Sequence, residues 1–242
     1  DVALPVLEDL KIKSFFFVYT SIFEGKPDNL EIFRYFRMNY FKDINDFYIN
    51  FYKALNKDHN NFFKQNQTKI KDAKIKFQHY SIEDIKFRLV RDILLKKTDY
   101  EKTMSLMMNE KKFEPKTFYS NLFFNSEDLK NLNKLGHLVG LHSHNHPMLL
   151  ETLSYEEQKQ EYKQCISNIS KILDKSQDEI KWMSHPCGSY DNNTLQILKE
   201  LGIELGFKQI MTIEPEKGMK KINNSFLEIG RQDHSEIVKR MN

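Results

Sequence analysis

The stretch His137–Pro147 reads HLVGLHSHNHP, an apolar run followed at once by three histidines and a proline. The apolar run, His137–Leu141, is short and typical of a buried strand. His142 and His146 follow it four residues apart, and Pro147 fixes the chain after the second histidine. Neutral imidazoles at this spacing can converge on one zinc-like ion if the residues between them coil into a single turn. The stretch therefore predicts part of a divalent-metal site at the end of a strand.

Two histidines alone make an incomplete zinc site. A zinc hydrolase generally has three protein ligands and an open position for water, so a carboxylate from elsewhere in the protein must join them. The alternative is a solvated loop in which the histidines only cap backbone groups. The strand before His142 and the proline after His146 favour the metal site.

Strands and helices alternate on the carboxyl side of this stretch. Ser154 and Glu157 form a capping box that begins a helix, and Gly202 ends a later one. This order favours an α/β domain with a parallel sheet or barrel, whose loops at the carboxyl ends of the strands gather on one face. The expected elements are a strand within 11–21, a helix from Ser126 to Gly136, a helix from Ser154 to Leu173, a strand at Ile180–Met183, a helix at Thr194–Leu201 and a strand at Ile203–Phe207.

Residues 26–115 have a different character and are expected to form an all-helical insertion. Apolar residues recur there at spacings of three and four. Between its second and third helices, Asn56–Asp72 is rich in Asn, Gln, Lys and Asp and is expected to be an exposed loop. The remaining residues, 1–25 and 116–242, are expected to form the α/β domain. The four amphipathic segments are Leu30–Phe41, Ile44–Leu55, Ile82–Leu95 and Tyr100–Met108.

Composition narrows the classes of protein. Hydrophobic residues make up 40% of the 242, enough for a substantial core. The net charge of +3 gives no strong basic field, which argues against a nucleic-acid partner. Two cysteines cannot form a disulfide framework, and no stretch approaches the ~20 apolar residues that span a bilayer. A cytoplasmic location is the simpler expectation, with the bacterial envelope as the alternative if a removed signal preceded residue 1.

Two further segments carry reactive side chains. The loop Ser184–Tyr190 contains Cys187, whose thiolate could attack an acyl carbon with help from His185 or His234. Near the carboxyl end, Arg231, Asp233 and His234 fall within four residues. They could form an acid with its orienting partners, or an Arg–Asp pair that only ties down the last loop.

These segments together resemble the polysaccharide deacetylases, carbohydrate esterase family four, with their chitooligosaccharide-deacetylase homology domain. Gly140–Pro147 is similar to the family's His-Ser/Thr-x-x-His-Pro motif, and Ser184–Tyr190 followed by a helix resembles its Pro-aromatic-Gly turn. Phe15–Val18 after Leu4–Leu7 resembles the family's second strand and the helix before it. The similarity covers residues 1–25 and 116–242, and the helical insertion resembles those of a bacterial surface-polysaccharide branch.

The resemblance implies a distorted (β/α) barrel of about seven strands that removes acetyl groups from N-acetylated or O-acetylated sugars of a bacterial polysaccharide or its precursor. It implies a divalent metal, zinc first, with cobalt, nickel or manganese as alternatives. His142 and His146 match the metal-binding histidines, and the backbone N–H of Cys187 falls where the family stabilises an oxyanion. The implied substrate-binding residues are Ser184, His185, Pro186, Gly188 and Tyr190.

The sequence also departs from the family. The Asp-Asp motif that supplies the base and the third metal ligand has no counterpart in residues 1–242 and is expected just before Asp1, so residues 1–242 by themselves are expected to be inactive. The third motif lacks its arginine, and its aromatic position is Cys187. We expect His234 to be the general acid, with Asp233 or Arg231 setting its orientation, or Arg231 replacing the missing arginine.

Two alternatives to an active hydrolase remain at this point. One is a catalytically inactive, deacetylase-like protein that binds carbohydrate or assists polysaccharide assembly. The other is an interaction module in which the helical insertion is the functional part, and this insertion is also the surface expected in any homo-oligomer.

Overall fold

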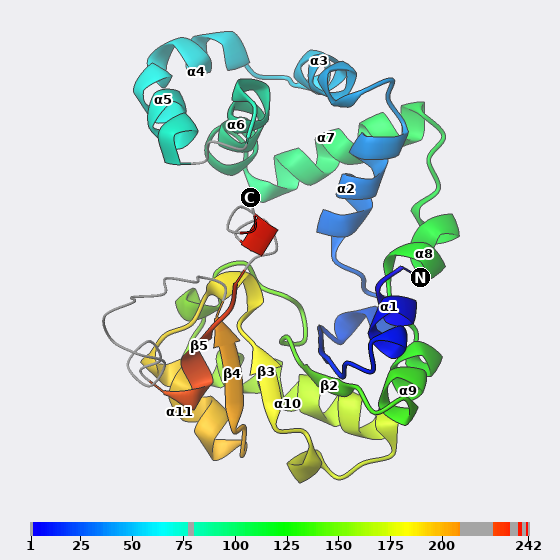
Figure 1. Cartoon of the computed structure of the whole chain (residues 1–242). Coiled ribbons are helices and arrows are strands. Elements are labelled where there is room, and N and C mark those ends of the chain that lie inside the picture. Colours follow the sequence, from blue (N-terminus) through cyan, green and yellow to red (C-terminus); the bar gives the residue numbers. More distant parts are fainter. Residues whose placement is uncertain (1, 77–79, 209–224, 233–236, 239–240, 242) are drawn as a thin grey trace. The chain divides into compact units, whose positions relative to one another are not determined.

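The computed structural model describes residues 2–76, 80–208, 225–232, 237–238 and 241 (Figure 1). The chain divides into two compact units. Unit 1 comprises Asp1–Asp28 and Phe123–Asn242, and unit 2 comprises Asn29–Leu122. Unit 1 contains the sheet, and unit 2 contains only helices among its described residues. Within the described ranges, no helix is long and apolar enough to cross a membrane.

The sheet of unit 1 is parallel throughout. Its strands lie in chain order, β1-β2-β3-β4-β5, and Phe15 of β1 pairs with Leu138 of β2. The prediction of an α/β domain with a parallel sheet is confirmed. The described residues form five strands and no closed barrel, so the expected barrel of about seven strands is not seen among them. The strands are β1 (Phe15–Val18), β2 (Leu138–Leu141), β3 (Trp182–Ser184), β4 (Leu205–Lys208) and β5 (Ile229–Gly230).

The helices of unit 1 begin at polar caps. Ser154 and Glu157 cap each other's backbone N–H groups at the start of α10, and Asp191 does the same with Thr194 at the start of α11. These side chains satisfy N–H groups that a helix leaves without internal partners. The elements are α1 (Ala3–Asp9), η1 (Ser21–Glu24), α9 (Ser126–Lys134), η4 (Leu150–Thr152), α10 (Tyr155–Leu173), η5 (Gln177–Glu179), η6 (Pro186–Gly188), α11 (Asn192–Glu200) and η7 (Phe226–Glu228).

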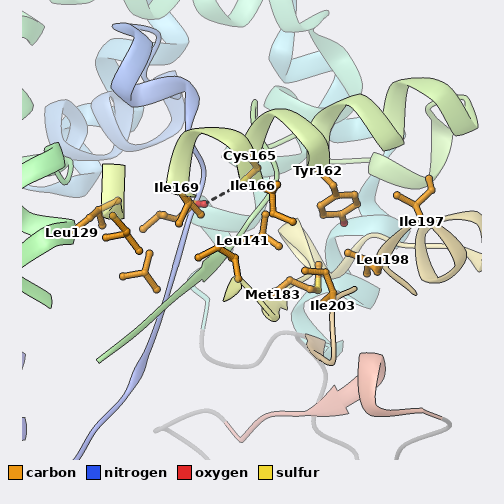
Figure 2. Close-up of a cluster of buried hydrophobic side chains, with 14 of the residues drawn as sticks. Leu129, Leu141, Tyr162, Cys165, Ile166, Ile169, Met183, Ile197, Leu198 and Ile203 are labelled. Atoms are coloured by element: carbon orange, nitrogen blue, oxygen red, sulfur yellow. Dashed lines mark hydrogen bonds between the residues drawn. The ribbon is translucent and has the colours of Figure 1, made fainter. Parts of the chain in front are cut away.

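The core of unit 1 lies between the sheet and α10. Figure 2 shows Tyr162 and Ile166 of α10 pointing toward Leu141 of β2 and Met183 of β3. All four side chains are buried. Burying an aliphatic side chain of this size stabilises a fold by about 1.5–3 kcal/mol. Cys165 is also buried here, and its Sγ lies 3.6 Å from the carbonyl oxygen of Val18.

Two glycines allow neighbouring strands and loops to approach closely. A Cβ on Gly140 would lie 2.6 Å from the carbonyl oxygen of Trp182, and one on Gly206 would lie 2.5 Å from that of Leu227. Both distances are too short for real carbon–oxygen contacts. Glycine is therefore required at the centre of β2 and of β4 for packing against Trp182 and Leu227.

Unit 2 has a core made largely of aromatic rings. Phe47 and Phe51 of α3 are fully buried and pack against Phe87 of α6. Met104 of α7 is buried as well. The elements of unit 2 are α2 (Asn29–Asn39), α3 (Ile44–Ala54), α4 (His59–Gln65), α5 (Gln67–Lys76), α6 (Ile82–Leu89), the π-helix η2 (Val90–Leu94), α7 (Lys97–Glu110), η3 (Pro115–Phe118) and α8 (Tyr119–Leu122).

The expected loop at Asn56–Asp72 is wrong. The segment forms α4 and most of α5. Asp58 caps α4 by accepting a hydrogen bond from the N–H of Asn61, and Phe63 and Ile70 are buried. Tertiary burial of two apolar residues outweighs the weak helical preference of the polar residues around them.

We expect Gly140→Ala to lower the free energy of unfolding of unit 1 by about 3 kcal/mol, because the new methyl would press against a backbone carbonyl. Gly202→Ala is the control: no atom lies within 4 Å of its Cβ position, although its φ is +74°. Its cost should be about 1 kcal/mol from backbone strain alone. Urea unfolding followed by the fluorescence of Trp182, the single tryptophan, reports on unit 1. Equal costs for the two variants would refute the packing argument.

Candidate metal centre

The histidine turn, residues 142–147, directly follows β2 at its carboxyl end. The N–H of His142 continues the β1–β2 pairing by donating to the carbonyl of Val18 at 3.1 Å. The turn then closes, because the N–H of His146 donates to Oγ of Ser143 at 3.1 Å. Ser143 and His146 both adopt left-handed backbone conformations, with φ of 64° and 55°. The four-residue spacing thus brings the rings of His142 and His146 together, with centroids 5.0 Å apart.

Other residues of the turn hold it in place. Glu161 of α10 accepts hydrogen bonds from the N–H groups of His144 and Asn145, at 2.9 and 2.7 Å. The ring of His144 contacts Oγ1 of Thr20 at 2.9 Å, and its backbone carbonyl accepts from the N–H groups of Thr20 and Ser21. His144 therefore anchors the turn through its contacts with Thr20, Ser21 and Glu161.

The two candidate ligands use the same ring nitrogen for a protein contact. Nδ1 of His142 lies 2.8 Å from the carbonyl oxygen of Ser184, and Nδ1 of His146 lies 2.9 Å from Oδ2 of Asp28. A carbonyl or an ionised carboxylate only accepts, so each Nδ1 carries the proton. Each neutral ring then has its lone pair on Nε2. When neutral, both side chains are thus in the tautomer that binds a metal through Nε2.

The two imidazoles differ in basicity. Burial lowers the pKa of His142 to about 4, with a further contribution from the neighbouring His146. Burial also acts to lower the pKa of His146, but the hydrogen bonds to Asp28 and Cys187 outweigh it and raise the pKa to about 9. A metal ion bound by both rings must therefore displace a proton from His146.

The donor atoms fit part of a zinc site. Two imidazole nitrogens agree with the preferences of Zn²⁺ and of similar divalent ions. Within the part of the chain that the structure describes, no group of three or more His, Cys, Asp and Glu side chains is arranged to hold a metal ion. Asp28 contacts the Nδ1 edge of His146 and so lies on the side opposite to Nε2. The described site supplies two ligands.

The loop after β3 brings a thiol to the same place. Cys187 is exposed, has a left-handed φ of 54°, and places Sγ 3.9 Å from Nε2 of His146. Its thiol thus contacts His146, which was not one of the two partners considered from the sequence. Of those two, His185 bonds to Leu227 through Nε2, and His234 lies outside the described residues. The role of its backbone N–H as an oxyanion donor stays a prediction.

Most of the expected substrate-binding residues of this loop face the protein interior. Ser184 and His185 are each 1% exposed, and Pro186 is buried. Nε2 of His185 donates to the carbonyl of Leu227 at 2.8 Å, and its ring stacks on Tyr190. The hydroxyl of Tyr190 donates to the buried carboxylate of Glu228 at 3.1 Å. Contact of these residues and of Gly188 with a substrate stays a prediction.

The expected acid and its partners are only partly described. Nε of Arg231 donates to the carbonyl of Lys208 at 3.1 Å, which ties the end of β5 to β4. Burial lowers the pKa of the Arg231 guanidinium. Asp233 and His234 lie outside the described residues, so their roles as acid and orienting group stay predictions.

Sequence reasoning missed Asp28 and Tyr19. The hydroxyl of Tyr19 accepts a hydrogen bond from the N–H of Asp28 at 3.0 Å, and its ring stacks on His146. In the sequence, Asp28 only precedes a helix and Tyr19 only ends an aromatic strand. Neither position carries a pattern that points to a histidine more than a hundred residues away.

Comparison with known proteins finds a family similarity in the region around this site. Residues 93–206 match the family model described as polysaccharide deacetylase. Over these residues the chain is similar to the polysaccharide deacetylase family. The deacetylase segment includes the histidine turn and the loop after β3, and it begins within unit 2. No curated protein is significantly similar to the chain.

Three solved structures resemble part of the chain. The Streptococcus pyogenes deacetylase PplD in complex with acetate is 25% identical, with a TM-score of 0.38 over 46% of this chain and 44% of that one. IcaB from Ammonifex degensii is 18% identical, with a TM-score of 0.34 over 44% of this chain and 46% of that one. The BpsB deacetylase domain from Bordetella bronchiseptica is 18% identical, with a TM-score of 0.36 over 46% and 49%. The match therefore spans less than half the length of each structure.

The buried His185 of the deacetylase segment should stay neutral in mild acid. Burial lowers its pKa from 6.5 to about 4. The unfolded chain takes up this proton near pH 6.5, so folding stability falls as the pH drops toward 4. ¹⁵N NMR should show a protonated Nε2 and an unprotonated Nδ1 for His185 at pH 5.5. A titration midpoint near 6.5 would contradict the buried hydrogen bond to Leu227.

Proposed function

We propose that the protein is a metal-dependent hydrolase that removes acetyl groups from N-acetylated or O-acetylated sugars of a bacterial polysaccharide or its precursor. The observation that carries this proposal is the pair His142 and His146 at the end of a parallel strand, with both Nδ1 atoms bonded to protein acceptors, so that each neutral ring has its lone pair on Nε2. The family match over residues 93–206 supports deacetylation as the reaction.

The proposed metal ligands in this chain are Nε2 of His142 and Nε2 of His146. A divalent ion bound there, zinc in the first place, would supply Lewis acidity toward the acetyl group and hydroxide near neutral pH. The third protein ligand and the base are assigned to the family's aspartate pair, which is not among the 242 residues. We also propose that the five described parallel strands are part of the distorted (β/α) barrel of about seven strands that the resemblance implies.

The chain's own residues have three further proposed tasks. The N–H of Cys187, held in a left-handed turn beside His146, donates to the oxygen that gains negative charge. His234 gives a proton to the departing nitrogen or oxygen, and Asp233 or Arg231 orients it. For an N-acetyl group the bond broken is the amide C–N bond, and the products are acetate and an amino sugar.

We expect His142→Gln in the full-length protein to abolish metal binding and to lower acetate release from an acetylated amino sugar by at least about 100-fold, because a lost ligand removes several kcal/mol of transition-state stabilisation. His144→Gln is the matched control, since His144 contacts Thr20 and takes no part in the proposed ligand set. Metal content and acetate are measured on the same samples.

Two results would count against the proposal in different ways. Undiminished metal content and activity in the His142→Gln variant would refute the ligand assignment. A metal-loaded wild-type protein that binds the sugar without releasing acetate would instead support the inactive, carbohydrate-binding alternative.

A further inference from the structure

Two contacts hold the ring of His146 on the sides away from Nε2. Oδ2 of Asp28 accepts from Nδ1 at 2.9 Å, and the ring of Tyr19 stacks on the imidazole with centroids 5.5 Å apart and planes 28° apart. The hydroxyl of Tyr19 also accepts from the backbone N–H of Asp28. Tyr19, Asp28 and His146 thus form a closed cluster in which each member touches the other two.

We propose that Asp28 is the positioning residue of the metal centre: it fixes the tautomer and orientation of His146 and so sets the affinity of the site for its metal. This inference rests on the proposed function, because it takes Nε2 of His146 as a metal ligand. Asp28 touches neither the metal nor the substrate. It acts through His146, and Tyr19 holds Asp28 in place.

Asp28 can influence the metal affinity of His146 because the acceptor that it offers to Nδ1–H is charged. A carboxylate bonded to Nδ1–H keeps the proton on that nitrogen, leaves the lone pair on Nε2, and makes Nε2 a stronger donor to a cation. The side chains of Asp28 and His146 are only 25% and 15% exposed, so water screens the contact weakly. A charge-assisted hydrogen bond in such a setting is stronger than one between neutral groups.

His142 provides an internal comparison. Its Nδ1 donates to the backbone carbonyl of Ser184, which fixes the same tautomer with a neutral acceptor that no side-chain substitution removes. His146 lies in a turn with a left-handed φ of 55°, and its tautomer is fixed by a side chain, that of Asp28. The two proposed ligands are therefore oriented by different means, and Asp28 is the one that mutation can test.

The competing explanation is a structural ion pair that only fastens the chain at the end of the first segment of unit 1. Both explanations predict some loss of stability in a variant without the carboxylate. They predict different metal affinities and different tautomers of His146 in the variant. Loss of a purely structural contact would change neither property once the protein is folded.

The test measures Zn²⁺ and Co²⁺ affinity of the wild-type protein and of Asp28→Ala, Asp28→Asn and Asp9→Ala. We expect Asp28→Ala to weaken binding by about 10–100-fold, the usual effect of removing an outer carboxylate from a metal-binding histidine. Asp28→Asn should fall between Asp28→Ala and the wild type, because its amide oxygen still accepts from Nδ1–H but carries no charge. Asp9→Ala is the matched control, since Asp9 is an exposed aspartate of α1 in the same unit.

Two readouts are independent of catalysis. At a pH above the pKa of His146, where the ring is neutral, ¹⁵N NMR of the metal-free protein should show the Nδ1–H form in the wild type and a mixture of tautomers in Asp28→Ala. Alkylation of Cys187 should slow when metal binds, because its Sγ lies 3.9 Å from Nε2 of His146, whereas Cys165 is buried and reacts little. The metal concentration that gives half-protection should rise in Asp28→Ala.

The outcomes separate this inference from the proposed function. Wild-type metal affinity in both Asp28 variants, with an unchanged His146 tautomer, would overturn the role of Asp28 and leave the metal site standing. A wild-type protein that binds neither ion would overturn both. If Asp28→Ala does not fold, a lower affinity of folded Asp28→Asn than of Asp9→Ala still supports the inference, and equal affinities refute it.

Discussion

The hydrogen bond from the His142 imidazole to the carbonyl of Ser184 joins the ends of two neighbouring strands, and the candidate site is arranged around it. Leu141 of β2 pairs with Met183 of β3, so the residues that follow each strand emerge side by side. Burial at this junction keeps His142 neutral, with a pKa of about 4. A shift in register between these strands would separate the ring of His142 from its acceptor. The pairing of β2 with β3 therefore determines how His142 is positioned and keeps its ring buried and neutral.

The loops around this junction have unfavourable backbone conformations. Ser143, His146 and Cys187 all have positive φ, although none of them is glycine. A non-glycine residue in such a conformation costs on the order of 1 kcal/mol or more, and strain of this kind concentrates at functional sites. The bonds from Glu161 to the turn offset part of the cost. In these conformations Sγ of Cys187 lies 3.9 Å from Nε2 of His146.

Local patterns predicted much of this protein, and long-range contacts account for what they missed. The parallel sheet, the capping box at Ser154, and the turn that pairs His142 with His146 all depend on residues close together in the chain. The contact of Asp28 with His146 joins positions 118 residues apart, and no periodicity marks either partner. The helices within Asn56–Asp72 form because burial of Phe63 and Ile70 overrides local composition. Closure of a barrel cannot be judged from strand patterns alone, since it depends on which strands meet at the edges.

The position of unit 2 in the chain has a consequence for folding. Phe15 of β1 pairs with Leu138 of β2, and all of unit 2 lies between them in the sequence. Closing so long a loop slows folding, because its entropy must be lost before the contacts that reward it form. Unit 2 has its own aromatic core and mostly local helical contacts, so it can form early and shorten the flexible path between the two strands. The order of events would then be unit 2 and the β2–β4 region first, and docking of β1 last. Tyr19 and Asp28 follow β1 in the chain, so the surroundings of His146 would be completed only when that final step succeeds.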